Sequence, residues 1–245
     1  MNYRYATERP NFADLASGQV FYSLPGHPAF PIRLASEVFQ RCQSLRGKAG
    51  AAVSVYDPCC GAAYHLSVLA FLHWDSIRQV IASDVDPRAV QLAEHNLSLL
   101  TPQGMDRRIR EITAMLRLYG KPSHQLAFES ADRLRERVNA LYRVRPIQQH
   151  VFQADALDRE ALARQLEGFQ LDIIFTDLPY GQHSHWQGLS TNPGADLLAA
   201  LRLHMQPDSV VAIASVKDRK QAVDGFRQVE KLQVGKRQVV FLMTA

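Results

Sequence analysis

Short apolar runs alternate with helical patterns along almost the whole chain, and this alternation restricts the fold more than any other feature. Such alternation is typical of strand–helix–strand units, whose strands pair in parallel. Two further strand-like runs flank Gly235 at the end of the chain and predict an antiparallel hairpin. We therefore expect an α/β fold with a mostly parallel sheet. The expected strands before this hairpin are Ser54–Asp57, Val80–Asp84, Gln148–Phe152, Leu171–Phe175 and Val210–Ala214.

Helical patterns fill the intervals between these strands. Asp86 stands at an expected N-cap with Pro87 in the first helical position, and apolar residues then recur at helical spacing. The other expected helices cover 63–74, 159–166 and 196–205. Residues 1–48 are expected to form an N-terminal arm followed by a helix, and the arm either covers a ligand or holds RNA through Arg33.

Residues 101–147 interrupt the alternation, because a connection of only a few residues is usual at this point. Their composition is helical, and Pro and Gly punctuate them, so we expect a helical insertion. Its GKPS stretch (Gly120–Ser123) is expected to form a helix–helix turn, with contact to RNA as the second interpretation. This segment holds ten Lys/Arg and five Asp/Glu, whereas the net charge of the whole chain is +4. A basic helical segment suits a polyanion such as RNA, with Arg107 and Arg108 as candidate phosphate contacts. A solvated helical face is the alternative.

Composition excludes several other classes. There is no run of about 18 apolar residues and no apolar segment near the N-terminus, so we expect neither a membrane span nor a secretory signal. Three cysteines are too few for a disulfide framework, and adjacent Cys59 and Cys60 lack metal-ligand spacing. We expect a cytoplasmic, monomeric protein without a metal.

Four aspartates stand at or just beyond the ends of expected parallel strands: Asp57, Asp84, Asp155 and Asp177. Ligands of such sheets bind outside the carboxyl ends of the strands, so we expect one crevice lined by all four. The first turn lacks the glycines of a phosphate site, and an acid at its start favours an ammonium group. Asp84 is placed to accept from a ribose diol, and Asp155 from an adenine amine. Together these groups indicate S-adenosylmethionine. The expected cofactor-binding residues are Asp57, Pro58, Cys59, Cys60, Gly61, Ala62, Asp84, Asp155, Ala156 and Asp177.

The motifs DPCCGAA, ASDVDP, QADAL and TDLPYG resemble, in this order, those of Rossmann-like class I S-adenosylmethionine-dependent methyltransferases. Nearly the full length, insertion included, is similar to the avilamycin-resistance 23S rRNA guanine methyltransferase family, for example in FYSLPGHPAFPIRLASEVFQR and TDLPYGQHSHWQG. The resemblance implies a single domain over residues 1–245 and a seven-stranded sheet with helices on both faces. It also implies methylation of a guanine ring nitrogen in 23S rRNA and resistance to orthosomycin antibiotics.

One position departs from the family pattern. The first motif usually ends in glycine, and here Ala63 takes that place after Gly61 and Ala62. A methyl group is tolerated there if φ of Ala63 is negative, whereas a positive φ is expected to weaken cofactor binding.

The stretch from Asp177 to Tyr180 supplies the expected catalytic groups. A base nitrogen that shares its lone pair with the ring is a poor nucleophile, so a group must accept its proton, and Asp177 is the candidate. The carbonyl of Leu178 or Pro179 takes a second hydrogen bond, and Pro179 stiffens the turn. Tyr180 stacks on a target base that has left its stack. The following loop is expected on the substrate side through His183, His185 and Trp186; a metal pair, an ordinary polar loop and, for Trp186, core packing are the alternatives.

Three other functions remain open at this stage. A protein glutamine-amide methyltransferase also has a proline–aromatic fourth motif, although it usually begins with asparagine. A DNA amino-methyltransferase shares the motif as well, and a basic insertion does not separate DNA from RNA. A non-catalytic RNA-binding protein that retains the fold is favoured by Ala62 and Ala63.

Overall fold

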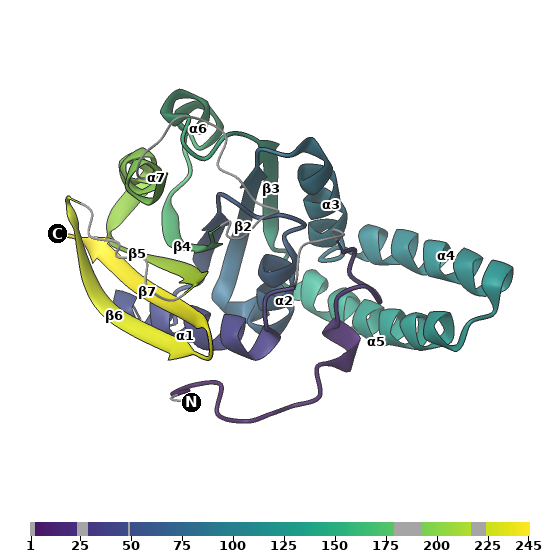
Figure 1. Ribbon diagram of the computed structural model, residues 1–245. Helices are drawn as coiled ribbons and strands as arrows, with labels where there is room; N and C mark the ends of the chain where they lie inside the picture. Colours follow the sequence, from purple (N-terminus) through teal and green to yellow (C-terminus); the bar gives the residue numbers. More distant parts are fainter. Residues whose placement is uncertain (1–2, 24–28, 49, 179–192, 217–223) are drawn as a thin grey trace.

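The computed structural model describes residues 3–23, 29–48, 50–178, 193–216 and 224–245, which form a seven-stranded sheet in the order β3-β2-β1-β4-β5-β7-β6 (Figure 1). Strands β3, β2, β1, β4 and β5 run parallel, and β7 is antiparallel to both β5 and β6. The mostly parallel sheet and the C-terminal antiparallel hairpin are thus confirmed. The strands are β1 (Val53–Asp57), β2 (Ile77–Asp84), β3 (Gln148–Gln153), β4 (Leu171–Asp177), β5 (Met205–Val216), β6 (Phe226–Val234) and β7 (Arg237–Thr244).

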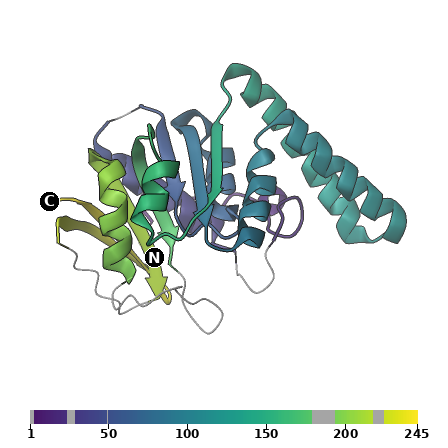
Figure 2. The same ribbon diagram turned by 90° about the horizontal axis from the view of Figure 1, so that it is seen from above.

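Helices cover both faces of the sheet, as expected. One face packs against α1 (Ile32–Arg46), α2 (Tyr64–Leu72) and α3 (Pro87–Ser98), and the other against α6 (Arg159–Gln165) and α7 (Pro193–Leu201) (Figures 1 and 2). All residues of β1 are buried, and so are all residues of β4 except the last one, Asp177. Strands covered on both faces read as continuous apolar runs, which explains why they were visible in the sequence.

Local chemistry sets several element boundaries. The Asp86 side chain accepts from the backbone N–H of Arg88 and caps α3, and Pro87 occupies the first turn, as predicted. The helix expected at 196–205 instead spans Pro193–Leu201, a short 3-10 turn follows it, and β5 begins at Met205. Pairing of Met205 with Leu171 extends β5 beyond the apolar run from which it was predicted.

The insertion is a pair of antiparallel helices, α4 (Pro102–Tyr119) and α5 (Pro122–Val144), that projects from the rest of the molecule (Figures 1 and 2). Gly120 ends α4 in the left-handed conformation with φ 57°, and Pro122 begins α5, so the predicted helix–helix turn is confirmed. At its base, α4 crosses α3 so closely that a Cβ on Gly104 would lie 1.9 Å from the carbonyl oxygen of Ser98.

The N-terminal arm (residues 3–23) is held against α1. The buried Glu37 carboxylate accepts from three consecutive backbone N–H groups, those of residues 4–6. Arg33 donates to the carbonyls of Ala6 and Thr7, so its guanidinium fixes the arm. In the part of the chain that the structure describes, no helix is long and apolar enough to cross a membrane.

Candidate active site

The four predicted aspartates lie at one edge of the sheet. Asp57, Asp84 and Asp177 are the last residues of β1, β2 and β4, and Asp155 follows β3 by two residues. These strands are neighbours in the order β3-β2-β1-β4 and run parallel, so their carboxyl ends share an edge.

A cavity of about 120 Å³ opens at this edge. It is lined by residues of the N-terminal arm, by Ala29 and Phe30 shortly before α1, by the turn after β1, by the start of α2 and by Asp177. Asp84 and Asp155 do not line this cavity, so the structure brings only two of the four carboxylates into it. The lining residues are Ser17, Tyr22, Ser23, Ala29, Phe30, Asp57, Cys59, Cys60, Gly61, Ala62, Tyr64, His65 and Asp177.

Asp57 is fully buried, and burial raises the pKa of its carboxyl group to about 8. Its Oδ1 accepts from the backbone N–H of Cys59, whereas Oδ2 lies 3.3 Å from Nε2 of His65 and has no hydrogen bond of good geometry within the described residues. Burial lowers the pKa of His65 to about 4, so this imidazole is neutral near pH 7. A buried carboxyl group with a spare oxygen beside a neutral ring is suited to accept from an ammonium group.

Asp84 and Asp155 shape the backbone around them. Asp84 accepts from the backbone N–H of Gly61 at 2.8 Å and of Asp86 at 3.0 Å, one bond to each oxygen. Asp155 accepts from the N–H of Leu157 at 2.9 Å, and Ala156 beside it is buried. Each carboxylate oxygen has a further lone pair, so both residues can still accept from a ligand.

The residues at this edge fit S-adenosylmethionine by their chemistry. The orphaned Oδ2 of Asp57 suits an ammonium group, and the two further carboxylates suit a diol and an amine. A Cβ on Gly61 would meet no atom within 4 Å, which leaves open space beside the turn. Burial raises the pKa of the Cys59 and Cys60 thiols, so neither is a thiolate at neutral pH.

Ala63 adopts a left-handed conformation with φ 51°, and no other non-glycine residue in the described ranges has a positive φ. This is the positive φ for which weaker cofactor binding is expected. Its carbonyl accepts from both the N–H and the hydroxyl of Ser67, which fixes the start of α2. For an L-residue this conformation costs about 1–2 kcal/mol.

Asp177 pairs with a residue that the sequence did not indicate. Nη1 of Arg237 on β7 donates to Oδ2 of Asp177 at 2.8 Å, whereas Oδ1 is buried without a hydrogen-bond partner among the described residues. Burial raises the pKa of Asp177, and the positive charge and hydrogen bond of Arg237 oppose that rise. The next residue, Leu178, is buried, and its N–H donates to the carbonyl of Ala214.

The arm is attached to the insertion and to the first turn. The buried side chain of Asn96 on α3 accepts from the N–H of Tyr22 and donates to the carbonyls of Tyr22 and Ala62. The Tyr22 hydroxyl donates to Glu111 on α4 at 2.6 Å. These bonds hold the arm over the cavity.

The prediction that Arg108 contacts RNA phosphate is wrong. Its side chain is buried, and Nε and Nη2 donate to the carbonyls of Val20 and Gln19, while Nη1 pairs with Glu111. The helical period places Arg108 on the side of α4 that faces the arm. Arg107 is exposed on the other side and donates to the Ser98 hydroxyl.

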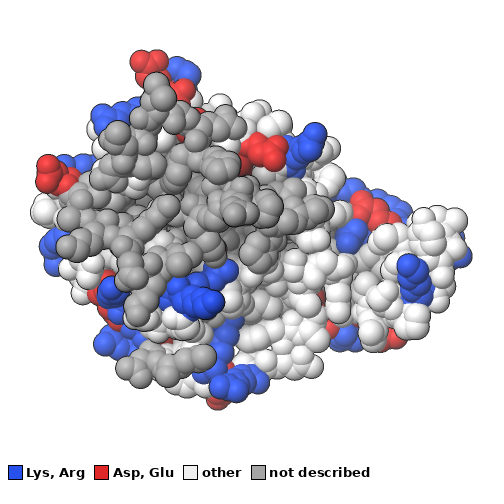
Figure 3. All heavy atoms as spheres, in the orientation of Figure 1, with Lys and Arg blue, Asp and Glu red and all other residues white. Residues whose placement is uncertain are grey.

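The insertion offers fewer cations to a partner than its composition indicated. Other arginines also bind within the protein: Arg133 to Asp14, Arg135 to Asp132, Arg137 to the carbonyl of Phe71 and Arg145 to that of Trp74. On the face shown in Figure 3, the Lys and Arg side chains of the α4–α5 insertion lie apart from one another. The exposed cations of the α4–α5 insertion whose side chains pair with neither a carboxylate nor a backbone carbonyl of the described residues are Arg107, Arg110, Arg117, Lys121 and Arg143.

Several predicted site residues lie outside the described ranges: Pro179, Tyr180, His183, His185 and Trp186. Their roles stay predictions. Among the described residues, no group of three or more His, Cys, Asp and Glu side chains is arranged to hold a metal ion.

Several residues of the site were not predicted: besides Ser17, Tyr22, Ser23, Ala29, Phe30 and Tyr64 of the cavity lining, they are His65, Asn96 and Arg237. His65 lies within an apolar helical run, Asn96 in an ordinary helix, and Arg237 sixty positions after its partner Asp177. An asparagine on the apolar side of the α3 pattern, between Ala93 and Leu97, was the one available signal, because a polar side chain there needs buried partners.

Comparison with known proteins gives matches over nearly the whole chain. A family model described as rRNA methyltransferase AviRa matches residues 1–237. The 23S rRNA (guanine(2535)-N(1))-methyltransferase of Streptomyces viridochromogenes is 43% identical over 244 residues, which are 99% of this chain and 96% of the relative. A solved structure of the rRNA methyltransferase aviRa from the same organism has a TM-score of 0.88 at 42% identity and covers 99% of this chain and 96% of that one. TrmN from Thermus thermophilus shares the fold, with a TM-score of 0.52, 16% identity and coverage of 90% of this chain and 51% of that one.

Proposed function

Because the chain belongs to the AviRa rRNA methyltransferase family, we propose that it transfers a methyl group from S-adenosylmethionine to N1 of a guanine in 23S rRNA. The family supports rRNA as the substrate, and N1 is the nitrogen named for the Streptomyces relative. The observation that carries the proposal within this chain is the cavity shared by the first turn and Asp177. It puts the candidate proton acceptor beside the candidate cofactor residues.

S-adenosylmethionine supplies an electrophilic methyl group on a sulfonium. The residues proposed to hold it are the turn from Asp57 to Ala62, together with Asp84, Asp155 and Ala156. Asp57 binds the ammonium group through its spare oxygen, and Asp84 binds the ribose. Tyr22 of the arm and Phe30, shortly before α1, exclude water from the cavity that they line.

Asp177 performs the acid–base step in this proposal. The N1–H proton of guanine moves to the carboxylate, which frees the nitrogen lone pair. Holding the base and the methyl group in line lowers the activation barrier by about 7–11 kcal/mol. Proton acceptance raises the rate by about 10²–10⁴-fold, which is a smaller reduction of that barrier. Positioning is therefore the larger effect, and it is served by the place of Asp177 at the end of the otherwise buried strand β4.

The exposed cations of the α4–α5 insertion are proposed to bind rRNA phosphates. Arg107, Arg110 and Arg117 are spaced at positions i, i+3 and i+10 of α4, and therefore lie on one exposed side. Each lost contact should reduce the slope of log affinity against log salt by about 0.7–0.9. Charge reversal of Arg110 and Arg117 that leaves RNA affinity and its salt slope unchanged would argue against this surface.

Mass spectrometry of 23S rRNA from cells with and without the gene tests the function. The expected result is one guanosine that carries a methyl group only when the gene is present, and that stops reverse transcription because N1 takes part in base pairing. The purified chain should restore the modification on ribosomal RNA from cells that lack the gene. Methylation of DNA or of a protein glutamine instead, or binding of RNA without methyl transfer, would establish one of the alternatives.

Three wider expectations accompany this function. A methyl group on the target guanine is proposed to reduce sensitivity to orthosomycin antibiotics, and the inhibitory concentration of avilamycin with and without the gene tests this. We also expect a monomer, which size-exclusion chromatography with light scattering tests, and a cytoplasmic location, which cell fractionation tests.

A further inference from the structure

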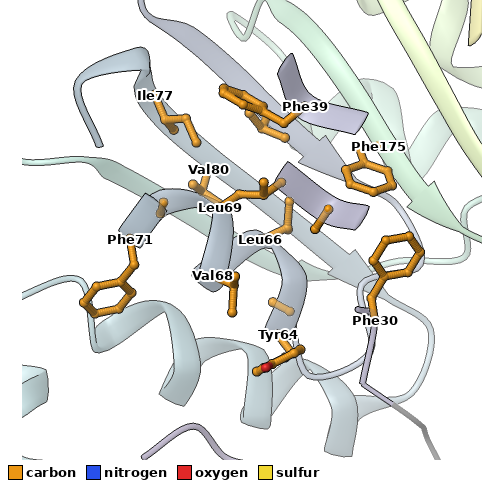
Figure 4. Close-up of a cluster of buried hydrophobic side chains, with 14 of the residues drawn as sticks. Phe30, Phe39, Tyr64, Leu66, Val68, Leu69, Phe71, Ile77, Val80 and Phe175 are labelled. Atoms are coloured by element: carbon orange, nitrogen blue, oxygen red, sulfur yellow. The ribbon is translucent and has the colours of Figure 1, made fainter. Parts of the chain in front are cut away.

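Arg237 is fixed at the edge of the cavity by contacts on two sides. Its Nη1 donates to Oδ2 of Asp177 at 2.8 Å, and its guanidinium carbon lies 5.0 Å from the centroid of the Phe30 ring. Phe30 is itself held edge-on against Phe175 of β4, with ring centroids 5.3 Å apart (Figure 4). Arg237 therefore has a defined place beside two residues that line the cavity, Asp177 and Phe30.

The two oxygens of Asp177 differ in their surroundings. Oδ2 is bound to Arg237, whereas Oδ1 is buried with no hydrogen-bond partner in the described part of the chain. A buried acceptor without a donor is costly, so the site favours a ligand that brings an N–H group to Oδ1. Next to that N–H, the ligand meets the positive charge of a guanidinium.

Guanine matches this arrangement and adenine does not. On the Watson–Crick edge of guanine, the N1–H donor adjoins the O6 acceptor. On that of adenine, an unprotonated N1 adjoins a donor amine. Adenine would place an acceptor against Asp177 and a donor against Arg237, and both contacts would be unfavourable.

We infer that Arg237 is a specificity-determining and catalytic residue, which donates a hydrogen bond to guanine O6 while Asp177 accepts from N1–H. The inference rests on the proposed function and identifies the group that selects the base. The planar fork of arginine carries several N–H donors, so one guanidinium can bind the carboxylate and O6 together.

The same contact assists the chemistry. When the N1–H bond breaks, the proton goes to the Asp177 carboxylate and the electron pair stays on the base, where it is shared between N1 and O6. That pair forms the new N1–CH₃ bond, and the pair of the broken S–CH₃ bond remains on sulfur. A cation at O6 stabilises the negative charge that develops there, which is the role of an oxyanion-hole donor.

Two substitutions of Arg237 separate the effect of its positive charge from that of its planar hydrogen-bonding fork. In Arg237→Gln the charge is lost, so kcat on rRNA should fall by about 10²–10³, the usual effect of removing one such donor. In Arg237→Lys the charge near Asp177 is retained without the fork, so the pH dependence should stay close to wild type while kcat still falls. Arg227→Gln on the neighbouring strand β6 is the matched control, because Arg227 is exposed, and its activity should be unchanged.

The pH profile distinguishes this role from a structural one. Arg237 opposes the rise in the pKa of Asp177 that burial causes, so Arg237→Gln should move the acid limb of the kcat/KM profile to higher pH. The other ionisable groups at the cavity are Asp57 on β1, His65 on α2, Cys59, Cys60, Tyr22 and Tyr64, and none of them is changed in the variant. Calorimetric affinity for S-adenosylmethionine should remain at the wild-type value, and the unfolding temperature should fall by no more than about 2–4 °C, because glutamine retains an amide donor at this position.

Base selection gives the second measurement. RNA with adenosine at the target position is compared with guanosine RNA, and the guanosine-to-adenosine ratio of kcat/KM should fall at least about tenfold in Arg237→Gln, since one good base contact is worth about 1–3 kcal/mol. An unchanged ratio and an unshifted pH profile would overturn the inference, as would a fall in activity that only parallels a loss of stability. If the wild-type chain methylates no guanosine in rRNA, the proposed function itself fails, and this outcome is visible before any variant is compared.

Discussion

Replacement of Arg108 by methionine tests whether the base of the insertion serves the substrate or the fold. The buried guanidinium donates to the carbonyls of Val20 and Gln19 at 2.7 and 2.9 Å and pairs with Glu111 at 3.0 Å. It also lies 4.1 Å from the centroid of the Tyr22 ring. Methionine keeps much of the volume of the side chain but removes every donor.

The expected loss of stability follows from these contacts. The Val20 carbonyl is left buried without its donor, which costs about 1–3 kcal/mol, and loss of the partly exposed bonds to Gln19 and Glu111 adds about 1 kcal/mol. For a domain of this size, 1 kcal/mol shifts the unfolding temperature by about 2–4 °C, so the resulting loss of about 2–4 kcal/mol should lower it by about 4–16 °C. The arm carries Tyr22 and lines the cavity, so the affinity for S-adenosylmethionine should fall as well.

Urea unfolding, isothermal titration with S-adenosylmethionine and an RNA-binding titration measure the three effects. Arg107→Met is the control: its side chain is exposed, so stability should change by about 0.5 kcal/mol or less. The reasoning is refuted if Arg108→Met unfolds within about 1 kcal/mol of wild type. It is also refuted if RNA affinity falls while stability and cofactor affinity stay unchanged, since that pattern belongs to a phosphate contact.

Three further predictions concern the first turn and the end of β4. Ala63→Gly should stabilise the protein by about 0.5–1 kcal/mol in urea unfolding, because glycine removes the strain of the positive φ at some entropic cost. Ala62→Gly is the control and should destabilise the protein, because Ala62 does not have a positive φ. A loss of stability in Ala63→Gly would contradict this account. Burial raises the pKa of Asp57 to about 8, so its carboxyl group is mostly protonated at pH 7. An ammonium group beside this carboxyl group lowers the pKa again. Binding of S-adenosylmethionine should therefore release up to one proton. Calorimetry in buffers of different ionisation enthalpy measures the release, which should vanish in Asp57→Asn, and an equal release by that variant would exclude Asp57 as its source. Asp177→Asn should lower kcat by about 10²–10⁴ and leave cofactor affinity near wild type, and turnover at the wild-type rate would remove Asp177 from the proton step.

The sequence was sufficient for the framework of the fold. Parallel strands covered on both faces read as apolar runs, and a local cap such as Asp86 before Pro87 marks a helix start without tertiary information. The insertion was visible for the same reason, because Gly120 and Pro122 punctuate a long helical composition. Strand direction then placed Asp57, Asp84 and Asp177 at one edge.

Contacts between distant segments were beyond this reasoning. Arg237 reads as an ordinary strand residue until β7 is placed next to β5, two strands from Asp177. Arg107 and Arg108 are adjacent and identical in type, yet one is exposed and the other buried, and only the packing of the arm against α4 decides which. The sign of φ at Ala63 likewise depends on how the turn joins its neighbours.

The arm is attached to both helices of the α4–α5 insertion, and this limits what deletion of the insertion can show about RNA binding. Arg108 on α4 holds residues 19 and 20, while Ser130 and Arg133 on α5 hold Asp14. Excision of the whole insertion would thus release the arm that lines the cavity, and loss of activity in the product would say nothing about RNA binding. A shorter excision of residues 116–125 spares every one of these fastenings and removes only the outer end, with Arg117 and Lys121.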